Sequence, residues 1–333
     1  MKHGANIYKY AKKLGCNAED IVDFSSNINL YNPKNNFSIT SALTNKYADS
    51  SYKKLKNIIS KNYQIKKSNI ALFNGASSAI FELFKHLDAK RVYLYAPLYG
   101  EYEDALDAKT KLIKINRFKN LHQKVKKGST VVFVNPSTPD AKNYDLSDLM
   151  DYWQKRNCTI ILDESFLEFE GLASYRHNIQ TYDKLYIIQS FTKFYSCAGV
   201  RIGAIFSSKD NVKKFKIARW NISSFDVAFL SQRLQDKKFI SKSKVFHLKQ
   251  KKELKNILKT SNLFSKIYKS KSNFFLCKSK YAKELFKHLL KHKILVRDAS
   301  SFDFLDTKHL RFAVKDKKSH KKLQKALKDF KHE

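Results

Sequence analysis

Residues 190–203 read SFTKFYSCAGVRIG and contain one lysine, Lys193, shortly after an apolar run, KLYII, that is typical of a buried strand. A lysine held at the end of a strand and beside the cation Arg201 has its ammonium form destabilised, which leaves a neutral amine that can attack carbonyl groups. The other interpretation is that Lys193 is an ordinary solvated lysine, because the chain has 65 lysines and arginines. The groups at other strand ends must decide between the two.

Three further apolar runs end in groups that suit ligand binding. NIALF leads into Gly75, Ala76 and Ser77 at the start of an expected helix, where backbone N–H groups and small side chains suit an anion. CTIIL ends in Asp163, a carboxylate whose burial is costly unless it is paired. TVVFV ends in a loop, residues 135–139, that presents amide and hydroxyl groups. Taken singly, these features also fit a glycine turn with a serine cap, a salt bridge or helix cap, and a proline-stiffened turn.

The four strand ends are more informative together than singly. Ligands of open α/β sheets bind beyond the carboxyl ends of the strands. An anion cradle, polar side chains, a carboxylate and an amine are the groups that pyridoxal phosphate requires. Its phosphate needs the cradle, its aldehyde needs a lysine for a Schiff base, and its pyridine nitrogen needs a carboxylate to keep it protonated. The combination therefore predicts pyridoxal phosphate as the cofactor.

The elements that position these groups follow an alternating pattern. From residue 69 the chain reads NIALFN, a helix over 77–87, RVYLY, KLIKI, TVVFV, a helix over 145–156, CTIIL, KLYII and IGAIF. This alternation predicts an α/β fold with a largely parallel sheet between helices. After about residue 209 the pattern predicts a smaller α+β lobe with helices over 226–258, 281–291 and 316–331 and strands over 273–277 and 310–314.

Composition excludes several classes of protein. The chain has 333 residues and 43% hydrophobic residues, enough for a large core. No run approaches the roughly 18 apolar residues of a membrane span, so we expect no membrane partner. Four separated cysteines indicate reduced thiols in the cytoplasm, and the ten histidines suggest no metal site. The net charge of +35 is spread over the expected helices, which favours solvated helix faces over a nucleic-acid-binding surface.

The segments HGANIYKYAKKLG, DFSSNIN, NGASSAIFE, DESFLEF and SFTKFYSCAGVRIG resemble the class I/II aminotransferases of fold type I, which use pyridoxal phosphate. The resemblance covers nearly the whole chain. Within the family it is greatest to the threonine-phosphate decarboxylases of cobalamin biosynthesis and to the related histidinol-phosphate aminotransferases. It implies a large domain with a mostly parallel seven-stranded sheet and a smaller α+β domain. We expect an N-terminal arm with part of the small domain (1–38), a large domain (39–215) and a small C-terminal domain (216–333).

The resemblance also implies roles for individual residues. Lys193 would form the Schiff base, Asp163 would pair with the pyridine nitrogen, and Tyr99 would stack on the ring. The residues that would hold the cofactor phosphate are Gly75, Ala76, Ser77, Ser190, Thr192 and Arg201, together with Tyr47 from the other subunit of a homodimer. The residues that would bind substrate are Arg311, as the carboxylate ligand, and His3 and Asn29 in an N-terminal segment that closes over it.

The chain departs from the family pattern at several positions. The family loop usually reads NPNNPTG, whereas here NPSTPDA places Thr138 where an asparagine contacts the ring hydroxyl. Phe166 replaces a tyrosine that is frequent in aminotransferases, Ser78 replaces a common glutamate, and WNISSF over 220–225 lacks the usual proline. The phenylalanine agrees better with the decarboxylases.

These features favour a decarboxylase that acts on a phosphorylated hydroxy-amino acid such as threonine phosphate or serine phosphate. The alternative is an aminotransferase of the histidinol-phosphate type, because the reaction depends on how the substrate is oriented and motifs hardly record that. A basic nucleic-acid-binding protein built on a retired enzyme fold is a minor alternative, suggested by the charge.

Overall fold

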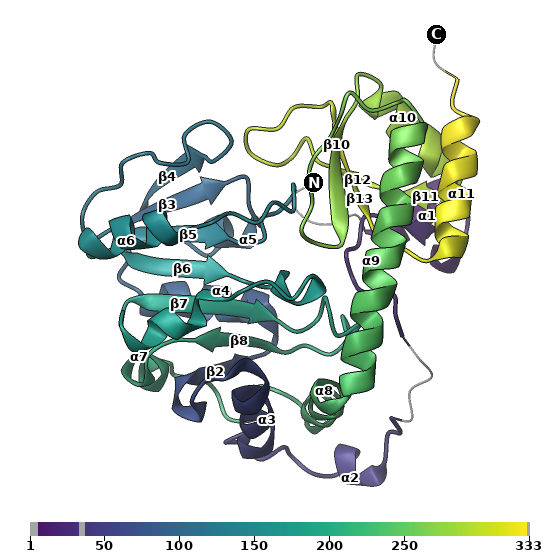
Figure 1. Ribbon diagram of the computed structural model, residues 1–333. Coiled ribbons are helices and arrows are strands. Elements are labelled where there is room, and N and C mark those ends of the chain that lie inside the picture. The colour runs from purple at the N-terminus through teal and green to yellow at the C-terminus, as the bar shows by residue number, and fades with distance from the viewer. Residues whose placement is uncertain (1–5, 33–36, 332–333) are drawn as a thin grey trace.

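The computed structural model describes residues 6–32 and 37–331, which form a seven-stranded and a four-stranded sheet with helices packed on both (Figure 1). The larger sheet has the strand order β2-β8-β7-β6-β5-β3-β4. Its strands are parallel except for β8, which runs antiparallel to both neighbours. Their bounds are β2 (Ile70–Phe73), β3 (Arg91–Ala96), β4 (Lys111–Asn116), β5 (Thr130–Val134), β6 (Thr159–Asp163), β7 (Leu185–Ser190) and β8 (Gly203–Phe206).

Helices cover both faces of this sheet, because its central strands are apolar on both sides. Val131 of β5 enters one core with Trp153, whereas its neighbour Val132 enters the opposite core with Leu83. Fully burying an aliphatic side chain of this kind contributes about 1.5–3 kcal/mol. The surrounding helices are α2 (Ser41–Thr44), α3 (Lys53–Tyr63), α4 (Gly75–His86), α5 (Glu101–Asp104), α6 (Ser147–Lys155), α7 (Lys209–Lys214) and α8 (Ser224–Gln235), with short 3-10 turns η2 (Lys67–Asn69), η3 (Leu167–Phe169) and η4 (Tyr175–Gln180).

The smaller sheet has the order β12-β13-β10-β9 and forms its own core with three helices. Its strands are β9 (Lys266–Ile267), β10 (Phe274–Lys278), β12 (Arg297–Asp298) and β13 (His309–Ala313), and its helices are α9 (Lys237–Thr260), α10 (Ala282–Lys291) and α11 (Lys317–Lys328). The N-terminal α1 (Ile7–Leu14) and η1 (Ala18–Asp20) lead to β1 (Val22–Asp23), which pairs in parallel with β11 (Ile294–Leu295). Helix α9 runs beside both sheets, since Phe239 belongs to the large core and Leu254 to the small one (Figure 1).

The structure confirms the predicted α/β class with its mostly parallel seven-stranded sheet. One prediction was wrong in detail: the single helix expected over 226–258 is two helices. Helix α9 begins at Lys237, directly after Asp236, whose side chain accepts a hydrogen bond from Phe239 N at 2.7 Å and thereby caps a new helix start. The predicted boundary at residue 216 falls between α7 and α8, and the division into domains stays a prediction.

Lysines gather on the outer surface of the smaller core. Helices α9, α10 and α11 contain eighteen lysines and two glutamates, and sixteen of these lysines are exposed. Each helix turns two leucines into the small core, so the lysines cover the solvent side; these leucines are Leu254, Leu258, Leu285, Leu289, Leu323 and Leu327. None of the described helices is long and apolar enough to cross a membrane. The four cysteines, Cys16, Cys158, Cys197 and Cys277, are unpaired.

Candidate active site

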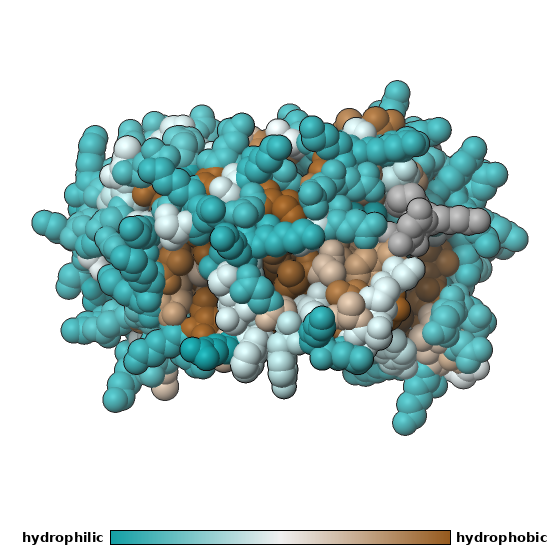
Figure 2. Space-filling model, turned by 90° about the horizontal axis from the view of Figure 1, so that it is seen from below, coloured by the Kyte–Doolittle hydropathy of each residue, from teal (hydrophilic) through white to brown (hydrophobic). Residues whose placement is uncertain are grey.

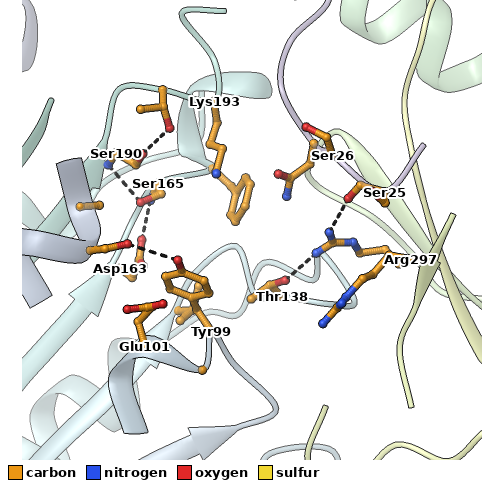
Figure 3. Close-up of a pocket in the computed structure, with 18 of the residues that line it drawn as sticks. Ser25, Ser26, Tyr99, Glu101, Thr138, Asp163, Ser165, Ser190, Lys193 and Arg297 are labelled. Atoms are coloured by element: carbon orange, nitrogen blue, oxygen red, sulfur yellow. Dashed lines mark hydrogen bonds between the residues drawn. The ribbon is translucent and has the colours of Figure 1, made fainter. Parts of the chain in front are cut away.

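A cavity of about 620 Å³ opens where the carboxyl ends of β5, β6 and β7 meet the smaller sheet (Figure 3). The start of α4 forms one wall, and the segment that follows β1 forms another. This is the position at which open α/β sheets bind ligands. Ten residues predicted from the sequence line the cavity: Ala76, Ser77, Tyr99, Thr138, Asp163, Ser190, Thr192, Lys193, Arg201 and Arg311.

Lys193 lies in the turn after β7 and points into this cavity (Figure 3). The pKa of its amine is lowered to about 8, first by burial and then by the nearby cations Arg311 and Arg201, while Asp163 opposes them. The turn is fixed to the N-terminal segment, because the Lys193 carbonyl accepts a hydrogen bond from Asn29 N at 2.9 Å. A held amine that loses its proton near neutral pH can act as a nucleophile and as a base.

Asp163 is the last residue of β6, and its side chain is 6% exposed. Burial raises the pKa of this carboxyl, and hydrogen bonds from Ser165 and Tyr102 act in the opposite direction. Tyr102 donates its hydroxyl to Oδ2 at 2.9 Å, and Ser165 N donates to Oδ1 at 2.9 Å. These donors keep a carboxylate in place at the bottom of the cavity, where it can accept a proton-bearing ring nitrogen.

The start of α4 lies at the cavity, where the sequence predicted an anion cradle. No side chain caps this helix at Asn74, and Ser77 lines the cavity in its first turn. Across from it, Ser190 and Thr192 bring their hydroxyls within 2.9 Å of each other, and Arg201 adds a guanidinium. A helix start, hydroxyls and an arginine together form a donor set suited to a phosphate dianion.

Two glycines allow the backbone around the start of α4 and the side chain of Arg201 to pack closely together. Gly75 has a φ of +84° and lies behind Arg201, so that a Cβ at this position would be 2.8 Å from Nη2 of Arg201. A Cβ at Gly203 of β8 would lie 2.5 Å from the backbone N of Ala76. Both positions therefore require glycine for the close approach of backbone and arginine. Gly75 supports the cradle without lining the cavity.

Arg311 projects from β13 at the other end of the cavity, and its side chain is 7% exposed. It donates from Nη1 to Thr138 Oγ1 at 3.2 Å and from Nη2 to the Ser25 carbonyl at 3.0 Å. Its guanidinium carbon lies 4.9 Å from the ring centre of Phe274, which packs edge-on against Phe166. Burial lowers the pKa of Arg311.

Sequence reasoning missed a second arginine in the cavity, Arg297. It lies on β12 directly opposite Arg311 on β13, is 2% exposed, and donates from Nη2 to Ser301 Oγ at 3.1 Å. Figure 3 shows Arg297 across the cavity from Asp163 and Ser190. The sequence contained one signal for it, an arginine directly after the apolar ILV in ILVRDAS. Ser25, Ser26 and Glu101 also line the cavity and were missed.

Two further predicted residues, Asn29 and Tyr47, lie outside the cavity. Asn29 is buried outside the cavity, where its amide donates to the Phe194 carbonyl at 2.8 Å and to Ser243 Oγ at 3.0 Å. It therefore fixes the lysine turn from behind. Tyr47 is 79% exposed and stacks on Trp220 with 4.6 Å between the ring centres. His3 lies outside the described residues.

We find no group of three metal-ligating side chains among residues 6–32 and 37–331. The sequence does contain one HxxxH pair that we had not expected, His288 of α10 and His292 directly after that helix. Their rings lie 4.5 Å apart, and His288 Nε2 lies 2.8 Å from the Ala326 carbonyl. His288 therefore links α10 to α11.

Comparisons with known proteins agree with this geometry. The family model for aminotransferase class I and II matches residues 4–330. The adenosylcobalamin biosynthesis bifunctional protein CobDQ of Leptospira interrogans is 29% identical over 97% of this chain, which spans 40% of that protein. A putative threonine-phosphate decarboxylase of Caldanaerobacter subterraneus is 26% identical over 98% of this chain and 93% of its own length. The histidinol-phosphate aminotransferase structure from Clostridium acetobutylicum has a TM-score of 0.79 and 27% identity, with 92% of this chain and 98% of that chain covered.

Proposed function

The chain belongs to the aminotransferase class I and II family, and we propose that it is a pyridoxal-phosphate-dependent decarboxylase of a phosphorylated amino acid such as threonine phosphate or serine phosphate. The relatives named as an adenosylcobalamin biosynthesis protein and a threonine-phosphate decarboxylase support this reaction. The similarity to histidinol-phosphate aminotransferases keeps transamination as the second candidate.

The residues present fit pyridoxal phosphate. When bound, this cofactor supplies an aldehyde that joins amino groups and a protonated ring that withdraws electrons from the bonds of an attached α-carbon. Lys193 would hold the aldehyde, and Asp163 would hold the ring nitrogen. The start of α4, with Ser77 and the hydroxyls and guanidinium opposite, would hold the phosphate.

The paired arginines carry the proposal for the substrate. Arg297 and Arg311 lie in register on adjacent strands, and both are almost fully buried in the cavity wall. Burying two guanidinium groups side by side is costly: burial lowers the pKa of both, and the carboxylates of Asp23 and Asp298 act in the opposite direction. A substrate with a carboxylate and a phosphate supplies two anionic groups in one molecule. Bidentate hydrogen bonds from guanidinium groups suit both.

The choice between decarboxylation and transamination depends on which α-carbon bond the protein aligns for cleavage. The Thr138 hydroxyl accepts a hydrogen bond from Arg311 Nη1 at 3.2 Å. This bond ties the arginine that we assign to the substrate carboxylate to the loop after β5. Phe166 offers no hydroxyl on the adjacent wall. Lys193 remains available as the proton carrier at the α-carbon in either reaction.

The test is a product assay on the purified protein loaded with cofactor. Threonine phosphate, serine phosphate and histidinol phosphate are supplied with and without 2-oxoglutarate. We expect carbon dioxide from threonine phosphate or serine phosphate in the absence of the keto acid. Glutamate formation from any of the three, with no carbon dioxide release, would establish the aminotransferase instead.

We further propose a homodimer in which Tyr47 reaches the cofactor phosphate of the neighbouring subunit. Tyr47 is too exposed to serve its own cavity, and it stacks on Trp220, which is itself 46% exposed. Ile39, next to α2, is 67% exposed. Figure 2 looks at the molecule from the side of α2, α3 and α8 and shows apolar patches there between hydrophilic side chains. A second copy of the chain would cover these patches.

A further inference from the structure

Arg117 lies directly after β4 and forms a buried ion pair with Asp140 in the loop that follows β5. The two side chains are 1% and 2% exposed. The loop reads NPSTPDA where the family pattern is NPNNPTG, so the aspartate stands where a threonine is usual. Neither residue lines the cavity, and no role in ligand binding has been given to either one above.

The guanidinium of Arg117 joins two segments that do line the cavity. Nη1 donates to the Pro97 carbonyl, two residues before Tyr99, and Nη2 donates to the Thr138 carbonyl at 3.2 Å and to Oδ1 of Asp140. The Arg117 backbone N also donates to the Ala96 carbonyl at 3.0 Å. The arginine therefore spans from the end of β3 to the loop after β5.

Asp140 completes this link from the loop side. Its Oδ1 also accepts a hydrogen bond from Ser137 Oγ at 2.7 Å, which fixes the turn that contains Thr138. The charge of Asp140 keeps the Arg117 guanidinium in the interior, where an arginine without a counter-ion is strongly destabilising. A buried ion pair is seldom more stable than well-packed apolar residues, so stability alone gives little reason for this pair.

We propose that Arg117 is a positioning residue that, with Asp140, sets the spacing between Tyr99 and Thr138 and so between the cofactor ring and Arg311. The inference depends on the proposed function, in which Tyr99 stacks on the ring and Arg311 binds the substrate carboxylate. Arg311 Nη1 donates a hydrogen bond to Thr138 Oγ1 at 3.2 Å, and through this bond the position of the loop determines the position of Arg311. Arg117 acts through these residues and touches neither ligand.

The main test variant is Arg117→Lys, which keeps the charge but loses the planar fork that reaches two carbonyls and a carboxylate at once. We expect the dissociation constant for pyridoxal phosphate, measured by absorbance titration of the apoenzyme, to rise. We also expect the KM for the phosphorylated amino acid to rise about 10- to 100-fold. The double variant Arg117→Met/Asp140→Leu removes both charges, leaves no buried unpaired ion, and is expected to lose the same positioning.

Glu170→Gln is the matched control. Glu170 pairs with Lys251, their side chains are 11% and 12% exposed, and neither residue lines the cavity. This variant breaks a comparable ion pair, so it should lower the melting temperature while the cofactor dissociation constant and the KM stay at the wild-type values. A general loss of stability would affect both kinds of variant alike.

Arg117→Lys made in a Thr138→Val protein tests whether Arg117 acts on Arg311 through Thr138. If Arg117 acts on Arg311 through this residue, Arg117→Lys should raise KM much less in a Thr138→Val protein than in the wild type. The inference is overturned if Arg117→Lys and the double variant keep the wild-type cofactor dissociation constant and KM. It is also overturned if the increases in KM caused by Arg117→Lys and by Thr138→Val multiply in full when the two substitutions are combined. A wild-type protein that binds no pyridoxal phosphate would instead contradict the proposed function itself.

Discussion

Arg297 and Arg311 lie directly opposite each other on the antiparallel strands β12 and β13, and both reach the same cavity. Adjacent guanidinium groups repel each other, and burial lowers the pKa of each one. An anionic ligand relieves both penalties at once. We therefore expect the pair to form the anion-binding end of the cavity, opposite Lys193 and Asp163.

Arg297→Met is expected to raise the KM for a phosphorylated amino acid about 10- to 100-fold, because a hydrogen bond to a charged group contributes about 1.5–3 kcal/mol. The KM for the same amino acid without its phosphate should change little. Steady-state kinetics with both compounds check this. Arg91→Gln, at the start of β3 and outside the cavity, is the control and should match the wild type. An equal loss with both compounds would show that Arg297 does not recognise the phosphate.

Removal of the Tyr102 hydroxyl should move the acid limb of the pH–rate profile. Burial raises the pKa of Asp163, and the hydrogen bond from Tyr102 lowers it, so Tyr102→Phe raises that pKa further. Activity requires the ionised carboxylate and is lost as pH falls through its pKa. The acid limb of kcat/KM should therefore shift to higher pH by about one unit.

The control for this shift is Tyr95→Phe. Tyr95 is also a buried tyrosine, but its hydroxyl accepts a hydrogen bond from Trp153 at 3.1 Å and lies outside the cavity. Its pH–rate profile should stay at the wild-type position. If both variants shift by the same amount, the effect is general and does not arise at Asp163.

The apoenzyme should be more stable when Lys193 is replaced by methionine, and the gain should depend on pH. Burial lowers the pKa of Lys193 from its usual value near 10.5 to about 8. Between these values the unfolded chain binds more protons than the folded one, so wild-type stability rises as pH increases from 8 to 10.5. Lys193→Met should therefore gain at most about 3 kcal/mol near pH 7 and lose this advantage above pH 10.5. Urea unfolding of both apoproteins across this range checks it, and a pH-independent difference would refute it.

Mixing two inactive variants tests the shared site. In a homodimer, a subunit with Lys193→Ala and a subunit with Tyr47→Ala form one complete site between them, with Tyr47 from the first and Lys193 from the second. We expect activity to return when the two proteins are unfolded together and refolded. Each variant refolded alone stays at its own low level. Failure to recover activity in dimers shown to be mixed would mean that Tyr47 serves no neighbouring site.

The sequence predicted the residues that follow long apolar strands, because buried parallel strands have a clear pattern and their carboxyl ends meet at one edge. Lys193 and Asp163 were found in this way, and the family resemblance added Arg311. Arg297 was missed since β12 has only two residues, and its pairing with β13 is a tertiary relationship without a periodic signal. Arg117 was missed for a different reason: arginines are usually exposed, and only the folded chain shows that this one is buried against Asp140.

The N-terminal segment was the least predictable part of the cavity. The motif DFSSNIN is one of the segments that carry the family resemblance, which assigned Asn29 to an N-terminal segment that closes over the substrate. In the structure Ser25 and Ser26 line the cavity, whereas Asn29 turns away to Phe194 and Ser243. Which side chains of this segment face the cavity depends on contacts with the turn after β7 and with α9, and the local sequence does not contain these contacts.

The most direct test of this account is to locate the covalent attachment of the cofactor. The protein is purified with pyridoxal phosphate, reduced with borohydride, digested, and mapped by mass spectrometry. We predict one pyridoxyl adduct, on the peptide that contains Lys193, and none in the Lys193→Ala protein. An adduct on a different lysine, or no adduct in protein that is folded and saturated with cofactor, would contradict the account.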